Sequence, residues 1–163
     1  MIVLLADVTL REYRALDAPA LAQVFHESVR MLGPRRYSAA QVEAWAPAPR
    51  DPADVHARAA DGRLTLVAVS PDGEILGYGD LEHDGHIDQL YCSPKAAGAG
   101  VAGQLLDALI GRAAGRGLTR LHVEASELAR GLFERRGFVI AARQDFELRG
   151  VPIHNYAMAR SLE

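Results

Sequence analysis

The feature that most restricts the fold of this chain is LYCSPKAAGAGVAGQLLDALIG, from Leu90 to Gly111, where a strand pattern, a small-residue loop and an apolar helix follow directly. Between Ala96 and Gly103 every residue except Val101 is glycine or alanine. Glycine lets the backbone approach a ligand closely, and unpaired amides at a helix start attract anions. The stretch therefore predicts a loop that holds an anion such as a diphosphate, with a tight turn lacking any ligand as the alternative.

Two nucleotide-binding motifs can be tested against this loop. The P-loop needs G-x-x-x-x-G-K-[ST], but Lys95, the only lysine in the chain, precedes the glycines, and no Lys-Ser or Lys-Thr follows them. The string GAGVAG, from Gly98 to Gly103, does match the dinucleotide fingerprint G-x-G-x-x-G. It follows three β-rich runs rather than the first strand of a doubly wound sheet, so neither motif is indicated.

Length, charge and cysteine content limit the class of protein. A chain of 163 residues fits one domain, and a net charge of −3 offers no basic field to nucleic acid or anionic membrane. Cys92 is the only cysteine, so an intramolecular disulfide is impossible. The apolar start ends at Leu5 and lacks a basic segment, which indicates neither a signal peptide nor a spanning helix. We expect one cytoplasmic domain over residues 1–163 that binds neither nucleic acid nor membrane.

The first third of the chain predicts one strand and three helices. The strand runs to about Arg14, and Asp17 then caps a helix that carries Pro19 in its first turn and stops at Gly33. Ser38 caps a second helix, and DPADVHARAADG predicts a third.

The middle of the chain changes from helical to strand periodicity, and the end alternates between the two. RLTLVAVSPDGEILGYGDLEHDGHIDQLYCS contains three β-rich runs separated by turn signals, which predicts an antiparallel meander. A helix with an apolar side follows, then the strand LTRLHVEAS, the helix ELARGLFERRG and a hairpin of FVIAARQDFEL with IHNYAMARSL. The predicted fold class is α+β, with a mixed, mostly antiparallel sheet flanked by helices.

Two motifs resemble those of a known family. LYCSPKAAGAGVAGQLLDALI resembles the acyl-CoA-binding motif of the GCN5-related N-acetyltransferases (GNAT family), usually hydrophobic-x-P-x-x-R/Q-G-x-G-x-G/A before a leucine-rich helix. SELARGLFERRGF is similar to the second motif, N-x-x-A-x-x-x-Y-x-x-x-G-F. The element order matches from about Val8 to Leu162, and the branch indicated is one of largely uncharacterised acetyltransferases. The second motif aligns at Ser126, Ala129, Phe133, Gly137 and Phe138.

The resemblance implies a binding site for acetyl-CoA as cosubstrate. The strand from Leu90 to Cys92 would bulge and separate from Leu121–Ala125, and the pantetheine arm would lie in the gap. The Leu90 amide would face the thioester oxygen, and one such donor contributes about 2.7 to 4 kcal/mol to catalysis. Cys92 and Ser93 would pair with the arm. The residues implied to bind acetyl-CoA are Leu90, Tyr91, Cys92, Ala97, Gly98, Ala99, Gly100, Val101, Ala102, Gly103, Ser126, Ala129 and Phe133.

Two positions depart from the family pattern. Ala97 replaces the usual Arg or Gln at the start of the loop, which removes a side-chain contact to phosphate but leaves the backbone amides. Phe133 replaces the tyrosine that often protonates the leaving thiolate. A thiol has a pKa of about 8.5, so CoA can leave without that help.

The catalytic base is expected on the strand HIDQLYC. Alternation places His86, Asp88 and Leu90 on one face, and the resemblance implies that the position of Asp88 often carries a base or a water-holding group. His86 is a second candidate; the alternative for both is an ordinary polar residue near a turn. These residues, with His83 and Asp84, lack the spacing of a metal site, so no metal is expected.

The predicted function is that of an acetyl-CoA-dependent N-acetyltransferase. A primary amine of a small molecule or a peptide would attack the thioester directly in a ternary complex. Alternatives are a covalent intermediate on Cys92, which we interpret instead as a small buried residue, and a non-catalytic acyl-CoA-binding sensor. Tyr156 could replace the missing acid, and the closing hairpin could form a homodimer. The acceptor-binding candidates, each of which could instead be a packing residue, are His26, Tyr37, Trp45, His154 and Tyr156.

Overall fold

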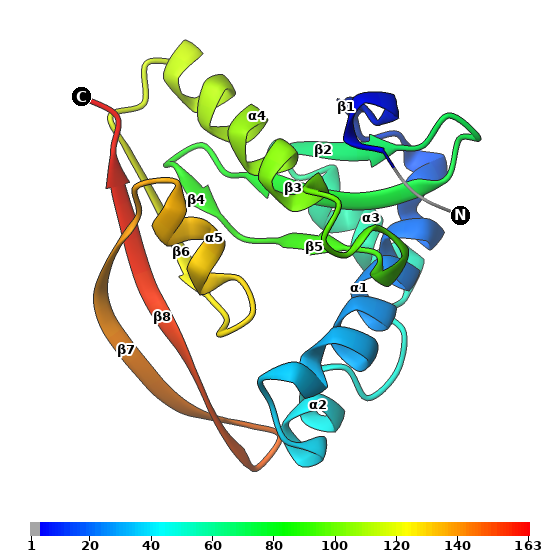
Figure 1. The fold of residues 1–163 in the computed structure, drawn as a ribbon, viewed down its shortest axis with the longest axis vertical. Coiled ribbons are helices and arrows are strands. Elements are labelled where there is room, and N and C mark those ends of the chain that lie inside the picture. Colours follow the sequence, from blue (N-terminus) through cyan, green and yellow to red (C-terminus); the bar gives the residue numbers. More distant parts are fainter. Residues whose placement is uncertain (1–3) are drawn as a thin grey trace.

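The computed structural model shows two four-stranded sheets, with helices packed against both (Figure 1). It describes residues 4–163, so the first three residues of the apolar start considered above lie outside the described part. The strand orders are β1-β2-β3-β5 and β4-β6-β8-β7, and the expected α+β class is confirmed. The helices are α1 Ala18–Leu32, α2 Ala39–Trp45, α3 Pro52–Ala59, α4 Val101–Gly115 and α5 Arg130–Arg135. The strands are β1 Thr9–Glu12, β2 Leu64–Val69, β3 Ile75–Leu81, β4 His86–Ile87, β5 Leu90–Cys92, β6 Arg120–Ala125, β7 Val139–Leu148 and β8 Val151–Ser161.

Ser38 and Asp17 both lie at the predicted helix starts, but only the Ser38 side chain makes a capping hydrogen bond. Ser38 Oγ accepts the Gln41 amide at 3.1 Å, and the Gln41 side chain accepts the Ser38 amide in return. Asp17 precedes α1, but in the described chain its carboxylate binds the Arg14 amide at 2.8 Å and the Arg11 guanidinium at 2.8 Å. Asp17 thus occupies the expected N-cap position, but its side chain makes no capping hydrogen bond, because it is bound to the short 3-10 turn (Ala15–Asp17) and to Arg11.

The third run of the meander is broken in two. Asp88 and Gln89 separate β4, which is parallel to β6, from β5, which is antiparallel to β3. The cause is buried Asp80, whose Oδ1 accepts the amides of Asp88 at 3.0 Å and Gln89 at 2.8 Å. Ile87 and Leu90 consequently pack on the same core. The expected alternation with His86, Asp88 and Leu90 on one face is wrong.

Two hydrophobic cores pack against the sheets. The larger one lies under α4 and α5, where Leu105, Leu106 and Leu109 are fully buried. The smaller one lies between α1 and the strands β2, β3 and β5. The closing hairpin is present, and β7 forms the outer edge of its sheet with nearly every residue exposed (Figure 1). Within residues 4–163, no helix combines the length and the apolar character needed to cross a membrane.

Candidate functional site

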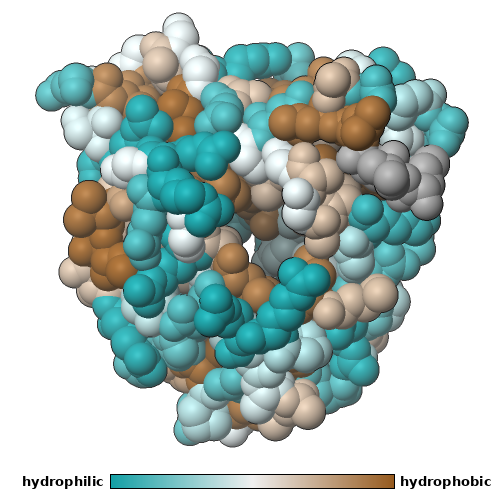
Figure 2. Space-filling view, viewed as in Figure 1, coloured by the Kyte–Doolittle hydropathy of each residue, from teal (hydrophilic) through white to brown (hydrophobic). Residues whose placement is uncertain are grey.

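A groove opens where β5 and β6 separate. Its volume is about 410 Å³, and its walls come from β5, the glycine loop, the start of α4 and the segment around α5. Figure 2 shows the surface hollowed near its centre, with polar and apolar side chains around the opening. Ala99 does not line this groove, and Phe133 lines a smaller adjoining cavity. The expected cofactor residues that line the groove are Leu90, Tyr91, Cys92, Ala97, Gly98, Gly100, Val101, Ala102, Gly103, Ser126 and Ala129.

The backbone of β5 has hydrogen-bonding groups directed into the gap. The Asp80 amide donates to the Gln89 carbonyl at 3.1 Å, and the Ser93 amide donates to a β3 carbonyl at 2.8 Å. Bonded and non-bonded pairs alternate in an antiparallel ladder. Leu90 and Cys92 therefore occupy non-bonded pairs with β3, and their amides point toward the side where β5 has no partner strand in the described chain. An extended ligand could pair with this edge.

The glycine loop presents a second set of unpaired amides. Gly98 and Gly100 have left-handed φ angles of 79° and 86°, and Gly100 immediately precedes α4. Among the described residues, the amides of Gly98 and of 100–103 have no hydrogen-bond acceptor. A Cβ at Gly98 would meet no atom within 4 Å, so this side of the loop is open. The loop has the geometry of an anion site at a helix start.

Two arginines outside the loop motif, which the sequence analysis did not connect with the loop, also line the groove. Arg35 lies just after α1, and Arg135 lies in α5. They supply positive charge near a loop whose own sequence has Ala97 in place of the family's Arg or Gln. Neither belongs to the loop motif, so only tertiary structure brings them to it.

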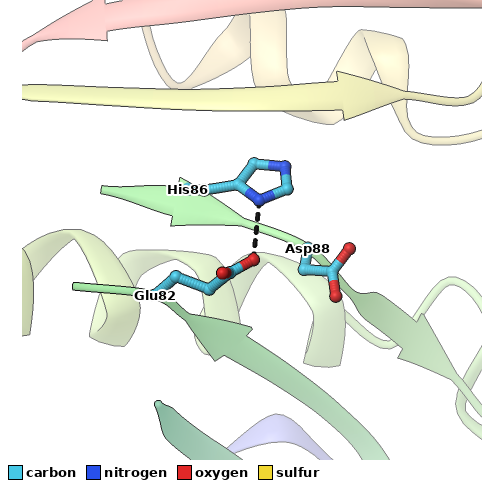
Figure 3. Close-up of side chains that lie close together, drawn as sticks. All are labelled: Glu82, His86 and Asp88. Atoms are coloured by element: carbon cyan, nitrogen blue, oxygen red, sulfur yellow. Dashed lines mark hydrogen bonds and ion pairs between the residues drawn. The ribbon is translucent and has the colours of Figure 1, made fainter. Parts of the chain in front are cut away.

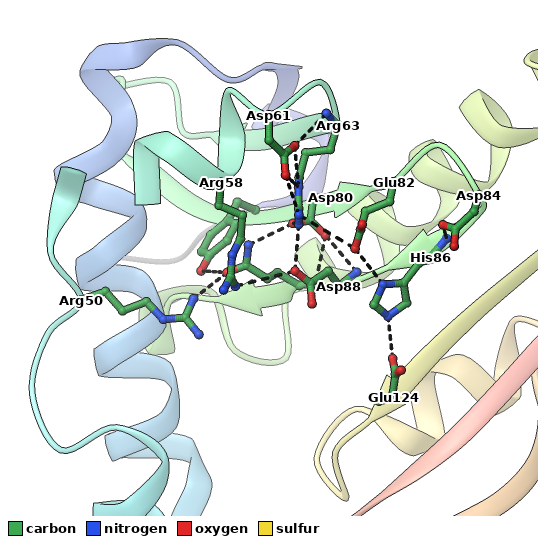
Figure 4. A network of polar contacts seen from close by, with 12 residues as sticks. Arg50, Arg58, Asp61, Arg63, Asp80, Glu82, Asp84, His86, Asp88 and Glu124 are labelled. Atoms are coloured by element: carbon green, nitrogen blue, oxygen red, sulfur yellow. Dashed lines mark hydrogen bonds and ion pairs between the residues drawn. The ribbon is translucent and has the colours of Figure 1, made fainter. Parts of the chain in front are cut away.

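A network of charged residues fixes the bend between β4 and β5 (Figure 4). Asp80 is fully buried, and Arg63 Nη1 donates to its Oδ2 at 2.9 Å and to Asp88 Oδ2 at 2.8 Å. Burial raises the pKa of Asp80, although its hydrogen bonds to Gln89 and Arg63 act in the opposite direction. Sequence reasoning missed Asp80. The available signal was an aspartate inside the β-rich run ILGYGDL, and the structure buries every residue of that strand. Through the two amides that it holds, Asp80 orients the segment that leads to Leu90.

Two carboxylates face the small cavity next to the groove, which has a volume of about 70 Å³. Asp88, the expected base, comes from the bend and is paired with Arg63. Glu124, which sequence reasoning missed, comes from β6, and its Oε2 lies 2.6 Å from His86 Nε2. Glu124 is an exposed residue of a strand with alternating burial, like other polar strand residues, so its local sequence did not single it out.

His86 lies between two carboxylates. Its Nδ1 is 2.8 Å from Glu82 Oε1, and Glu124 binds its other nitrogen (Figures 3 and 4). Burial disfavours the imidazolium, but the hydrogen bonds to Glu124 and Glu82 outweigh it and raise the pKa of His86. Glu82, His86 and Asp88 offer ligand atoms within 4.8 Å of one another. The Arg63 guanidinium bound to Asp88 would repel a cation there, and the described side chains of the cluster form a network of ion pairs.

A third hollow, of about 150 Å³, adjoins the small cavity, with which it shares Trp45, Tyr91, Glu124 and Ser126. Trp45, Tyr91 and Ser126 line all three hollows, which places them at the junction. The residues around the third hollow are Tyr37, Trp45, Tyr91, Glu124, Ser126, Phe146, Leu148, Ile153, His154 and Asn155. We call it the acceptor pocket, because residues expected from the sequence to bind the acceptor line it.

Three of the five expected acceptor residues line this pocket: Tyr37, Trp45 and His154. Tyr156 is not among the residues that line any of the three hollows; it is buried, and its hydroxyl donates to Glu127 at 2.6 Å. His26 lies on α1 and also lies outside these linings.

Cys92 is half-buried and lines the groove. Burial raises its pKa to about 12, so the thiol remains protonated at neutral pH. This disfavours a covalent acyl-cysteine intermediate and agrees with Cys92 as a small packing residue.

Comparison with known proteins gives consistent matches. The model of the acetyltransferase (GNAT) domain matches residues 34–160. The uncharacterized N-acetyltransferase YafP of Escherichia coli (strain K12) is 30% identical over 152 residues, covering 93% of this chain and 95% of that protein. The crystal structure of a GCN5-related N-acetyltransferase, described as aminotransferase, class-II, from Rhodopseudomonas palustris has 37% identity, a TM-score of 0.87 and 99% coverage of both chains. A GNAT superfamily phosphinothricin acetyltransferase from Sinorhizobium meliloti, in complex with acetyl-CoA, has 22% identity, a TM-score of 0.75 and coverage of 96% and 89%.

Proposed function

Because this chain belongs to the GNAT family of acetyltransferases, we propose that it transfers the acetyl group of acetyl-CoA to a primary amine by direct attack within a ternary complex. The family predicted from two motifs is confirmed, and the chain is an acyltransferase. The observation that carries the proposal is the gap between β5 and β6, with unpaired β5 amides along it and the amides of the glycine loop beside it.

The proposed cofactor position follows from these two sets of amides. The diphosphate would bind the amides of Gly98 and of 100–103, with Arg35 and Arg135 as nearby positive charges. The pantetheine arm would pair with β5 at Cys92. The thioester oxygen would then accept the Leu90 amide, and the developing oxyanion would be stabilised by about 2.7 to 4 kcal/mol.

The proposed chemistry forms one C–N bond and breaks one C–S bond. The amine nitrogen attacks the thioester carbon, the oxyanion collapses with loss of CoA as thiolate, and the second proton on nitrogen passes through solvent, where it can protonate that thiolate. Phe133 has no proton to give, and the Tyr156 hydroxyl is bound to Glu127, so we propose that the thiolate leaves without a side-chain acid. A proton must leave the ammonium before attack, and we propose Asp88, beside the small cavity, as the base or as the anchor of a water that takes it.

Calorimetry with acetyl-CoA followed by thiol release against a panel of amines tests the proposal. Ala97→Glu adds a negative charge to the exposed side of the loop and should weaken acetyl-CoA binding at least about tenfold. Gly111→Glu is the matched control, since it adds the same charge to an exposed position of α4 outside the groove. Equal weakening by both variants, or no binding by the parent protein, would contradict the proposed cofactor site. Tight binding without transfer to any amine would favour a sensor.

A further inference from the structure

The residues that line the acceptor pocket indicate which class of amine could bind there. Its described lining contains four aromatic rings and two aliphatic side chains, and none of its ten residues is arginine or lysine. The ring of Trp45 lies 5.4 Å from that of Tyr37 and 6.4 Å from that of Tyr91, which makes one continuous aromatic wall. A pocket with such walls binds an apolar body.

Glu124 is the only acidic residue in that lining. It also lines the small cavity, which shares lining residues with both the acceptor pocket and the groove, and 46% of its side chain is exposed. A carboxylate at this junction, next to the Trp45 and Tyr91 rings, suits an ammonium group that must enter the small cavity. The cationic end of the acceptor would therefore point toward the thioester, and its carbon skeleton would point into the pocket.

Three arginines outside the described lining are each bound to another group. Arg149 donates to the Ala44 carbonyl, Arg50 to Gln89 Oε1 at 2.6 Å, and Arg130 to Glu134 Oε1 at 2.7 Å. A carboxylate on the acceptor would thus lie among aromatic rings near Glu124, without a positive partner. Burial of an unpaired carboxylate is costly.

One polar group in the lining remains without a partner. Asn155 Oδ1 is buried and has no hydrogen-bond partner among the described residues. A buried acceptor oxygen of this kind is stabilised by a donor. It could accept a hydrogen bond from the amine or from one hydroxyl group on its skeleton.

We infer that the acceptor is a compact primary amine with an aromatic or branched aliphatic skeleton and no carboxylate. This inference rests on the proposed function and specifies its substrate class. The volume of about 150 Å³ agrees with a single ring or a short branched chain rather than a peptide. Glu124 binds the ammonium group, and the aromatic wall binds the skeleton.

Matched pairs of acceptors test this class with the full-length enzyme and acetyl-CoA. The pairs are phenethylamine with phenylalanine and isoamylamine with leucine, which differ only by the carboxylate. We expect kcat/KM for each amine to exceed that of its amino acid at least about thirtyfold. Equal or better use of the amino acids, or a preference for a lysine peptide or putrescine, would overturn the inference while leaving the proposed function intact.

Two variants and a binding measurement separate the possible failures. Glu124→Gln should raise KM for phenethylamine at least about tenfold and leave acetyl-CoA binding unchanged, whereas Glu147→Gln, on exposed β7, should change neither. Leu148→Arg should move the preference toward phenylalanine, because it supplies the missing positive charge. Calorimetry with phenethylamine and the CoA-bound protein is independent of turnover. Binding without transfer would support the pocket and contradict the proposed function, and an unchanged KM in Glu124→Gln would remove Glu124 from the inference.

Discussion

The cofactor groove and the acceptor pocket are built in different ways. The groove takes its main binding groups from one continuous segment, β5 with the glycine loop and the start of α4, and those groups are backbone amides. The pocket takes side chains from α2, β5, β6, β7 and β8, which lie far apart in the sequence. A local motif can specify backbone geometry, whereas a pocket of side chains depends on how the whole chain packs. The bend held by Asp80 lies between the two regions, and changes there should affect both.

The largest effect is expected from Asp80→Ala. The substitution removes the one fully buried carboxylate that pairs with Arg63, leaving only the more exposed Asp61 and Asp88, and it frees the amides of Asp88 and Gln89. Removal of one member of a buried ion pair costs about 3 to 5 kcal/mol. Urea unfolding should show this loss, and transferase activity should fall with it.

Asp61→Ala is the control for this substitution. Asp61 binds the same Arg63 side chain from an exposed position, so its removal should change stability only slightly. If Asp80→Ala is no less stable than Asp61→Ala, the bend does not depend on Asp80.

Asp88→Ala should lower kcat by roughly 10² if Asp88 is the base, while acetyl-CoA affinity stays near that of the parent protein. The reason is that Asp88 lines the small cavity but not the cofactor groove. The kcat–pH profile is the deciding measurement. A profile that keeps its acidic limb in the variant assigns the proton transfer to another group, and Glu124 is then the first to test.

Ala97→Arg should tighten acetyl-CoA binding about three- to tenfold, because it restores the charge that the family usually has at the loop start. Ala97→Gln, which restores the other usual residue, should give a smaller gain. Calorimetry measures both. An arginine that leaves the affinity unchanged would indicate that Arg35 and Arg135 already supply the charge at this end of the groove.

The smallest effect is a pH dependence that involves His86. Its folded pKa is raised above the ordinary value of 6.5, so its stabilising contribution is complete below pH 6.5 and is lost as pH rises through the folded pKa. The charged and titratable groups around it are Glu82, Asp84, Asp88, His122 and Glu124. The unfolding free energy of the parent protein should exceed that of His86→Asn by under about 1 kcal/mol at pH 6. The difference should shrink by pH 9, and a difference that grows with pH would contradict the assignment.

The sequence predicted the elements and the cofactor loop because both depend on local patterns. Ser38 with Gln41, the apolar side of α4 and the glycines before it are short-range signals, and all lie where they were expected. The break after Ile87 was not predicted, because it depends on the carboxylate of Asp80, a residue on the neighbouring strand. The prediction from strand alternation required one continuous strand, so it wrongly put His86 and Leu90 on the same face.

The acceptor side could be predicted only in part. Aromatic and histidine residues on the early helices and the last strand were identified, and Tyr37, Trp45 and His154 do meet around one pocket. Glu124 and Asn155 were missed because nothing in their local sequence distinguishes them from other polar strand residues. Their position becomes informative only when β6 and β8 are paired, with Glu124 opposite Ala157 and Asn155 opposite Gln144 of β7.

The buried thiol of Cys92 has a practical consequence for enzymology. At pH 8 a thiol with a pKa of about 12 contains roughly a thousandfold less thiolate than an ordinary one with a pKa of about 8.5. Disulfide reagents added to the native protein should therefore report almost only the CoA released by turnover, since this chain has no second cysteine. Unfolding would expose Cys92 and produce one equivalent of colour per chain. The same reagent can thus measure acetyl transfer in the folded enzyme and count denatured molecules in the same cuvette.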